Sequence, residues 1–182
     1  MDRLRRAALL LRLIERLRQR GSWCGETHLQ KATLFLQDLM QVPLGFEFIL
    51  YKHGPFSFDL RDELTALRAD ELVRLEPQRP YGPRIATTDR SAYIQGIYSK
   101  TLKKHDQGIS FVAEKLGSKG VADLERLATA LFVTQRADTG ASIEERARTL
   151  TTLKPHIAQE DAVAAVVTAD GMLDEARARA SA

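Results

Sequence analysis

The apolar positions near the start of the chain recur at steps of three and four residues. The stripe consists of Leu4, Ala7, Leu11, Ile14 and Leu17, which predicts an amphipathic helix over residues 3–20. Gly21 follows it, and glycine is common just after the end of a helix. The opposite side carries Arg5, Leu9, Arg12, Leu13, Arg16 and Arg20. Two interpretations stay open, a solvated face with two stray leucines or a docking surface for an acidic partner.

A second helix is predicted over residues 27–40. Its buried stripe consists of Leu29, Ala32, Phe35, Leu36 and Leu39. Thr27 and Gln30 have the spacing of a capping box, in which the two side chains satisfy the first backbone N–H groups of a helix. Pro43 and Gly45 end the segment.

The next stretch predicts a strand, a turn and a third helix. Residues 46–51 form a short run rich in β-formers, which favours a strand. In the turn at 52–55, Gly54 can adopt a positive φ and Pro55 restricts the backbone. A helix is expected over residues 57–71, capped by Ser57 or Asp59. Residues 72–76 and 84–88 can then pair as a hairpin.

The rest of the chain is predicted to be helical after a join near residues 89–108. A buried helix is marked by Leu124, Leu127, Ala128, Leu131 and Phe132. Ser142 and Glu145 have the spacing of a capping box, and the helix that they open closes at Lys154-Pro155. Residues 157–180 are rich in alanine and other helix formers, with Gly171 as a weak point or break.

These elements define the expected fold class, a mostly α protein of the α+β kind. The order helix, helix, strand, helix, hairpin over residues 1–90 matches a winged-helix-like module with a small β wing, the strand being an addition to that plan. Residues 91–182 are expected to form a C-terminal helical bundle that packs on this module.

Composition limits the kinds of site and the cellular location that we expect, but it does not indicate a function. The chain has 182 residues and one cysteine, Cys24, which excludes an intramolecular disulfide and a cysteine-rich zinc site. The apolar run at residues 7–11 is too short for a signal peptide or a membrane span. We therefore expect a cytoplasmic protein without membrane contact.

The net charge is +3, but the charge is distributed unevenly. Residues 1–20 carry a basic excess, with seven arginines against Asp2 and Glu15. The predicted third helix is acidic, and in a winged helix this helix normally enters the DNA major groove. Its carboxylates would face phosphates, which lowers affinity. The predicted wing is basic and supplies candidate DNA contacts at Arg79, Arg84 and Arg90. Protein binding is therefore favoured, with DNA binding as the alternative.

The sequence contains no pattern typical of an active site. The four histidines His28, His53, His105 and His156 are far apart, and none has a metal-ligand partner at a usual spacing. No glycine-rich phosphate loop precedes Lys-Ser or Lys-Thr, and no Gly-x-Ser-x-Gly elbow occurs. We expect neither an enzyme, nor a bound metal, nor a cofactor.

Two stretches resemble a known family. The first contains Leu29-Gln30-Lys31, and the second runs Tyr51-Lys52-His53-Gly54-Pro55-Phe56-Ser57. Together they resemble YwgA-like proteins, the Panacea antitoxin domain and the toxin-binding domain of DarG-type antitoxins. In these proteins a leucine-glutamine-lysine helix precedes a tyrosine-glycine-proline-tyrosine-serine turn. Residues 153–156, Leu-Lys-Pro-His, are similar to a junction in the helical tail of YwgA-like proteins. His53 stands here where the family has an aromatic residue, and Phe56 stands where the family has tyrosine.

The resemblance implies a non-catalytic binding and regulatory module in a toxin–antitoxin or phage-defence setting, with a protein partner. Within the turn, Gly54, Pro55 and Ser57 are expected to have structural roles. The candidate partner-binding residues are Arg5, Arg12, Arg16 and Arg20 on the first helix, Lys52, His53 and Phe56 in the turn, and Asp62 and Glu63 on the third helix. The alternative is a winged-helix transcriptional regulator.

Overall fold

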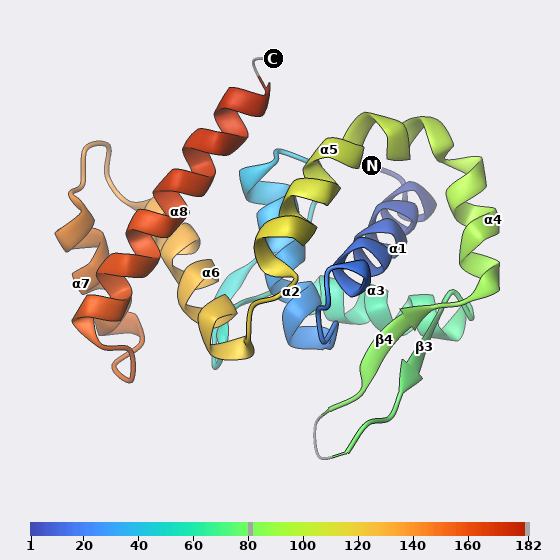
Figure 1. The fold of residues 1–182 in the computed structure, drawn as a ribbon, viewed down its shortest axis with the longest axis horizontal. Coiled ribbons are helices and arrows are strands. Elements are labelled where there is room, and N and C mark those ends of the chain that lie inside the picture. The colour runs from blue at the N-terminus through green and yellow to red at the C-terminus, as the bar shows by residue number, and fades with distance from the viewer. Residues whose placement is uncertain (80–81, 181–182) are drawn as a thin grey trace. The chain divides into compact units, whose positions relative to one another are not determined.

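The computed structural model describes residues 1–79 and 82–180, which form mostly helices together with two small antiparallel sheets (Figure 1). The chain divides into two units. Unit 1 comprises Met1–Ile49 and Phe56–Lys119, and unit 2 comprises Leu50–Pro55 and Gly120–Ala182. The boundary between the long segments of the two units lies after Lys119. In addition, one short loop of the front half belongs to unit 2.

Helix α1 (Arg3–Gln19) is the central helix of unit 1. It packs against α2, α4, α5 and β4, so apolar side chains are buried around most of its circumference. The buried set is Ala7, Ala8, Leu9, Leu10, Leu11, Leu13, Ile14 and Leu17. Leu9 and Leu13 are fully buried, so the interpretation of them as stray surface leucines is wrong. Asp2 caps the helix by accepting a hydrogen bond from the Arg5 N–H at 2.9 Å.

Helix α2 (Glu26–Leu34) continues into a π-helical turn, η1 (Phe35–Leu39). The residue before the helix is Gly25, and no side chain caps it. The predicted capping box at Thr27 is therefore wrong, because the helix begins one residue before Thr27. The Gln30 side chain instead bonds to the backbone of Ser57, which lies 27 residues further along the chain.

The predicted strand at 46–51 is shorter in the structure. Strand β1 (Ile49–Tyr51) pairs with β2 (Gly54–Phe56). Helix α3 (Phe58–Ala69) follows, and its cap is Ser57, whose hydroxyl accepts from the Leu60 N–H at 3.3 Å. Strands β3 (Val73–Glu76) and β4 (Arg84–Thr87) form the predicted hairpin, with Val73 opposite Thr87 and Glu76 opposite Arg84.

The segment predicted as a join is helical, which is the largest error in the sequence-based assignment. Helix α4 (Asp89–Ile97) is followed after Tyr98 by helix α5 (Ser99–Leu116). Helix α4 buries only Ser91 and Gln95, so it shows no apolar stripe that could reveal it. Helix α5 packs against α1, α2, η1 and α4, and its buried residues are Leu102, Gly108, Ile109, Phe111, Val112, Ala113 and Leu116.

Unit 2 contains helices α6 (Val121–Arg136), α7 (Ile143–Leu153) and α8 (Gln159–Ala180). The capping box of Ser142 and Glu145 at the start of α7 is confirmed. Gly171 does not break α8, because α8 packs along both α6 and α7 and this packing outweighs the low helix propensity of glycine. Arg146 of α7 makes two hydrogen bonds to Asp170 of α8, at 2.6 and 2.7 Å.

The lone cysteine is predicted to be chemically inert in the folded protein. Cys24 is fully buried, and this burial raises the pKa of its thiol to about 12 despite the nearby charges of Arg18 and Arg84. Since the thiolate is the reactive form, we expect iodoacetamide to leave the native chain unmodified and to alkylate it completely in concentrated guanidinium chloride. Intact-mass spectrometry measures both. Native labelling at the rate of a free thiol would contradict this burial.

Candidate functional site

The turn that the sequence singled out is exposed at its tip. Tyr51, Lys52 and His53 are all exposed, whereas Gly54 and Pro55 are buried and Phe56 is half-buried. We call residues 51–53 the tip. It is held in place by residues of unit 2 that lie more than 70 residues further along the chain.

Lys154 fixes the backbone of the tip. It is the residue at the C-terminal end of α7, and its side chain is only 6% exposed. Its ammonium donates hydrogen bonds to the carbonyl oxygens of Tyr51 and Lys52, at 2.7 and 2.6 Å. Two charge-assisted bonds to consecutive carbonyls restrict the conformation of this loop strongly.

Glu125 of α6 supplies the counter-charge. Its side chain is 10% exposed, and its Oε1 atom lies 3.3 Å from the Lys154 ammonium. Two exposed histidines flank the same carboxylate. His156 Nε2 lies 3.6 Å from Oε1, and His53 Nδ1 lies 3.9 Å from Oε2. We call Glu125, Lys154, His53 and His156 the clamp cluster.

Gly54 sits directly on α6. Its φ is +80°, and a Cβ atom placed on it would lie 3.0 Å from Thr129 Oγ1. The Thr129 hydroxyl donates to the Glu125 carbonyl at 2.7 Å, so it cannot move away without losing that bond. Both the backbone conformation and the space therefore require glycine here.

Replacing Gly54 with valine will destabilise the protein more than the same change at Gly140. Gly140 also has a positive φ, of +90°, but nothing lies within 4 Å of its Cβ position. The strain common to both sites costs about 1–3 kcal/mol, and the clash at Gly54 adds about 1–3 kcal/mol. Urea denaturation of the two variants measures the difference. Equal losses would mean that Gly54 does not contact α6 closely.

The far end of the turn is fixed within unit 1. The Gln30 side chain donates to the Ser57 carbonyl and accepts from the Ser57 N–H, both at 2.9 Å. Both residues are fully buried. The glutamine of the Leu-Gln-Lys stretch therefore binds the backbone of the turn serine, whereas its spacing from Thr27 predicted a role in a capping box.

The two candidate residues on the third helix differ in how exposed their side chains are. Asp62 is 75% exposed, but the Glu63 side chain is only 5% exposed. Glu63 bonds to Arg3 Nε at 3.2 Å and to Arg6 Nη2 at 3.0 Å. The buried Glu63 carboxylate therefore joins α3 to α1, and partner binding by this residue stays a prediction.

The arginines of α1 are also partly used inside unit 1. Arg12 donates to the Gln95 side chain at 2.8 Å, and Arg16 lies 3.3 Å from a carboxylate oxygen of Asp106. Arg5 and Arg20 are exposed. The four arginines therefore do not form one open docking face with apolar residues between them.

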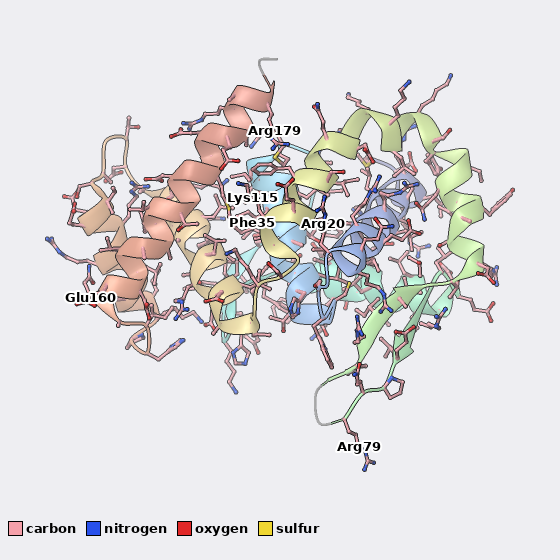
Figure 2. All side chains as sticks on the ribbon, viewed as in Figure 1. Arg20, Phe35, Arg79, Lys115, Glu160 and Arg179 are labelled. Atoms are coloured by element: carbon pink, nitrogen blue, oxygen red, sulfur yellow. The ribbon has the colours of Figure 1, made fainter. Side chains whose placement is uncertain are left out.

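Two of the three candidate DNA contacts are likewise engaged by other residues of unit 1, and the third is exposed. Arg84 donates to the Trp23 carbonyl at 3.2 Å and its guanidinium lies over the Trp23 ring, so it holds the hairpin to the segment after α1. Arg90 pairs with Glu71. Arg79 is exposed, and its side chain extends away from the hairpin (Figure 2).

No group of three or more His, Cys, Asp or Glu side chains within residues 1–79 and 82–180 has the geometry to hold a metal ion. The helices of these two ranges include none that is both long enough and apolar enough to cross a membrane. The sequence matches no family model and no curated protein.

Proposed function

We propose that this chain is a non-catalytic protein-interaction module of the antitoxin or phage-defence kind, which binds a protein partner through the tip and the adjacent His156. The observation that carries the proposal is the pair of hydrogen bonds from the buried Lys154 to the Tyr51 and Lys52 carbonyls. They hold an exposed loop in one conformation. A loop that is ordered before binding loses less entropy when the partner arrives.

The cost of the clamp cluster supports a functional role. Removing Lys154 and Glu125 from water is expensive, and well-packed apolar residues of similar volume are often at least as stabilising as a buried ion pair. Stability alone therefore does not account for the pair. What the pair adds is a fixed backbone under three exposed side chains, Tyr51, Lys52 and His53, all of which carry polar groups suited to partner recognition.

The resemblance supports the same proposal. Gln30 and Ser57 of its two stretches bond to each other, and Gly54 and Lys154 both belong to the surroundings of Glu125. The residues that carry the resemblance are thus the ones that shape the turn. We propose that helices α1, α2 and α3 with the β3–β4 hairpin form a winged-helix-like scaffold, and that the antitoxin-like role follows the family that the turn resembles.

DNA binding remains the alternative, and the charges favour it less. Of the three candidate contacts, Arg84 is held by Trp23 and Arg90 is paired with Glu71. Helix α3 exposes Asp59 and Asp62, which would repel phosphates in the reading position. Arg79 alone offers little counterion release.

Affinity capture from the cells that encode the protein tests the proposal. The tagged full chain is compared with Lys52→Glu and with Arg148→Glu, an equally drastic change at an exposed cation elsewhere in unit 2. We expect one protein to be retained by the parent and by Arg148→Glu and to be lost with Lys52→Glu, as measured by quantitative mass spectrometry with nuclease present. Retention on Lys52→Glu would refute the role of the tip. Capture that requires nucleic acid and Arg79 would establish the DNA-binding alternative.

A further inference from the structure

Helix α4 presents an apolar face that no other part of unit 1 covers. Tyr93 is 74% exposed and Ile97 is 55% exposed, and the two lie one turn apart on the same side of the helix. Ala92 and Gly96 lie beside them and are also exposed. Large exposed apolar side chains that gather on one surface typically mark an interaction site.

An open groove lies beside this face, and Ala92 and Gly96 line it, whereas Tyr93 and Ile97 do not. It has a volume of about 840 Å³ and is lined by residues of α4, the first half of α5 and α1. Ala92, Gly96 and Ser99 form one wall, and Lys103 and Lys104 line it from α5. Nothing lies within 4 Å of the Cβ position of Gly96, so the groove is open at that point.

The polar groups that line the groove from α1 are already satisfied. Gln95 accepts from Arg12 Nε at 2.8 Å and donates to a Glu15 carboxylate oxygen at 2.6 Å. Part of the lining consists of the small residues Ala92, Gly96 and Ser99. Small side chains allow the backbone of another helix to approach closely at that part of the groove.

The acidic side chains that line the groove are paired with arginines, whereas its lysines are not paired with any described residue. Glu15 and Asp106 are engaged by Arg12 and Arg16. Lys100, Lys103 and Lys104 are exposed, and they form no ion pair with any residue in the described ranges 1–79 and 82–180. A partner seated in the groove therefore meets cations that are open to new ion pairs, which favours an acidic partner.

We propose that this groove binds an acidic amphipathic helix of a partner protein. The apolar side of that helix packs on Ala92, Tyr93, Gly96 and Ile97, and its carboxylates face Lys103 and Lys104. This is the helix-in-groove mode of recognition, with apolar anchors at steps of three and four residues. The surface is distinct from the tip, so it does not depend on the proposed function of the tip.

A selection experiment tests the groove with the full chain. A displayed library of helix-forming peptides carries apolar anchors at helical spacing, and its flanking positions are drawn equally from Glu, Lys and Gln. We expect the enriched peptides to be rich in Glu and to bind about tenfold or more weakly to Gly96→Leu, which fills the groove. Raising the salt concentration should also weaken the binding of these peptides to the parent chain.

The matched control is Gly171→Leu, which places the same side chain on another helical glycine with nothing within 4 Å of its Cβ position. This variant should bind the selected peptides like the parent, and Lys103→Glu should bind them more weakly than Arg68→Glu does. Enrichment of Lys-rich peptides, no enrichment, or equal binding to both leucine variants would overturn the proposal. Self-association of the chain that Gly96→Leu abolishes would identify a second copy as the occupant and would also overturn it.

Discussion

Replacing Lys154 with methionine will lower the free energy of unfolding by about 3–5 kcal/mol, because the change leaves the buried Glu125 carboxylate without its partner. The Tyr51 and Lys52 carbonyls also lose their donor. Methionine has a similar length, so packing changes little. Urea denaturation followed by circular dichroism measures the loss. Lys104→Met, at an exposed lysine, serves as the control and should unfold like the parent.

The double variant Lys154→Met with Glu125→Leu separates the two contributions to this loss. The double variant no longer has an unpaired buried charge, but it still lacks the hydrogen bonds to the tip. We expect it to be clearly more stable than Lys154→Met alone and still to fail in partner capture, since the tip is no longer held. If the free energy of unfolding of Lys154→Met lies within about 1 kcal/mol of that of the parent, the buried Lys154–Glu125 pair does not stabilise the fold as we expect.

Reversing the charge of Glu63 will prevent stable folding of unit 1, whereas the same reversal at Asp62 will be tolerated. Glu63→Lys places a third cation against Arg3 and Arg6 in a site that is 5% exposed, which we expect to cost about 3–5 kcal/mol or more. Asp62 is 75% exposed, so Asp62→Lys should stay within about 0.5 kcal/mol of the parent.

Thermal melts of the two purified variants measure this contrast between adjacent residues. The soluble yield gives a second measurement should Glu63→Lys fail to fold. A melting temperature for Glu63→Lys equal to that of Asp62→Lys would show that the two arginines do not depend on this carboxylate.

Local patterns predicted the elements that bury one face. The periodicity of α1, the hairpin of β3 and β4, and the capping box at Ser142 all appear in the structure, because each depends on residues close in sequence. The pattern did not reveal that α1 is covered on most sides. A single stripe was assumed, although Leu9, Leu10 and Leu13 widen the apolar surface beyond one face.

Helix α4 was missed for the opposite reason. Helix α4 exposes its apolar residues and buries Ser91 and Gln95, so its pattern runs against the usual periodicity. The clamp cluster was missed because its members are separated by up to 103 residues. One usable signal was Glu125, a carboxylate directly beside Leu124 in a helix that was expected to be buried. Lys154 was assigned to the end of a helix and to the Leu-Lys-Pro-His stretch that resembles a family junction, and neither assignment placed it near the turn.

The path of the chain has a consequence for biosynthesis. Residues 50–55 belong to unit 2, yet the rest of that unit begins only at Gly120. On the ribosome, the tip is therefore made well before the helices that hold it, and its bonds to Lys154 span 102 and 103 residues. Contacts between residues that are so far apart in the sequence form late in folding. Most of unit 1 can be translated and compact while the loop still lacks its partners, so the tip reaches its final conformation only after Lys154 has been translated.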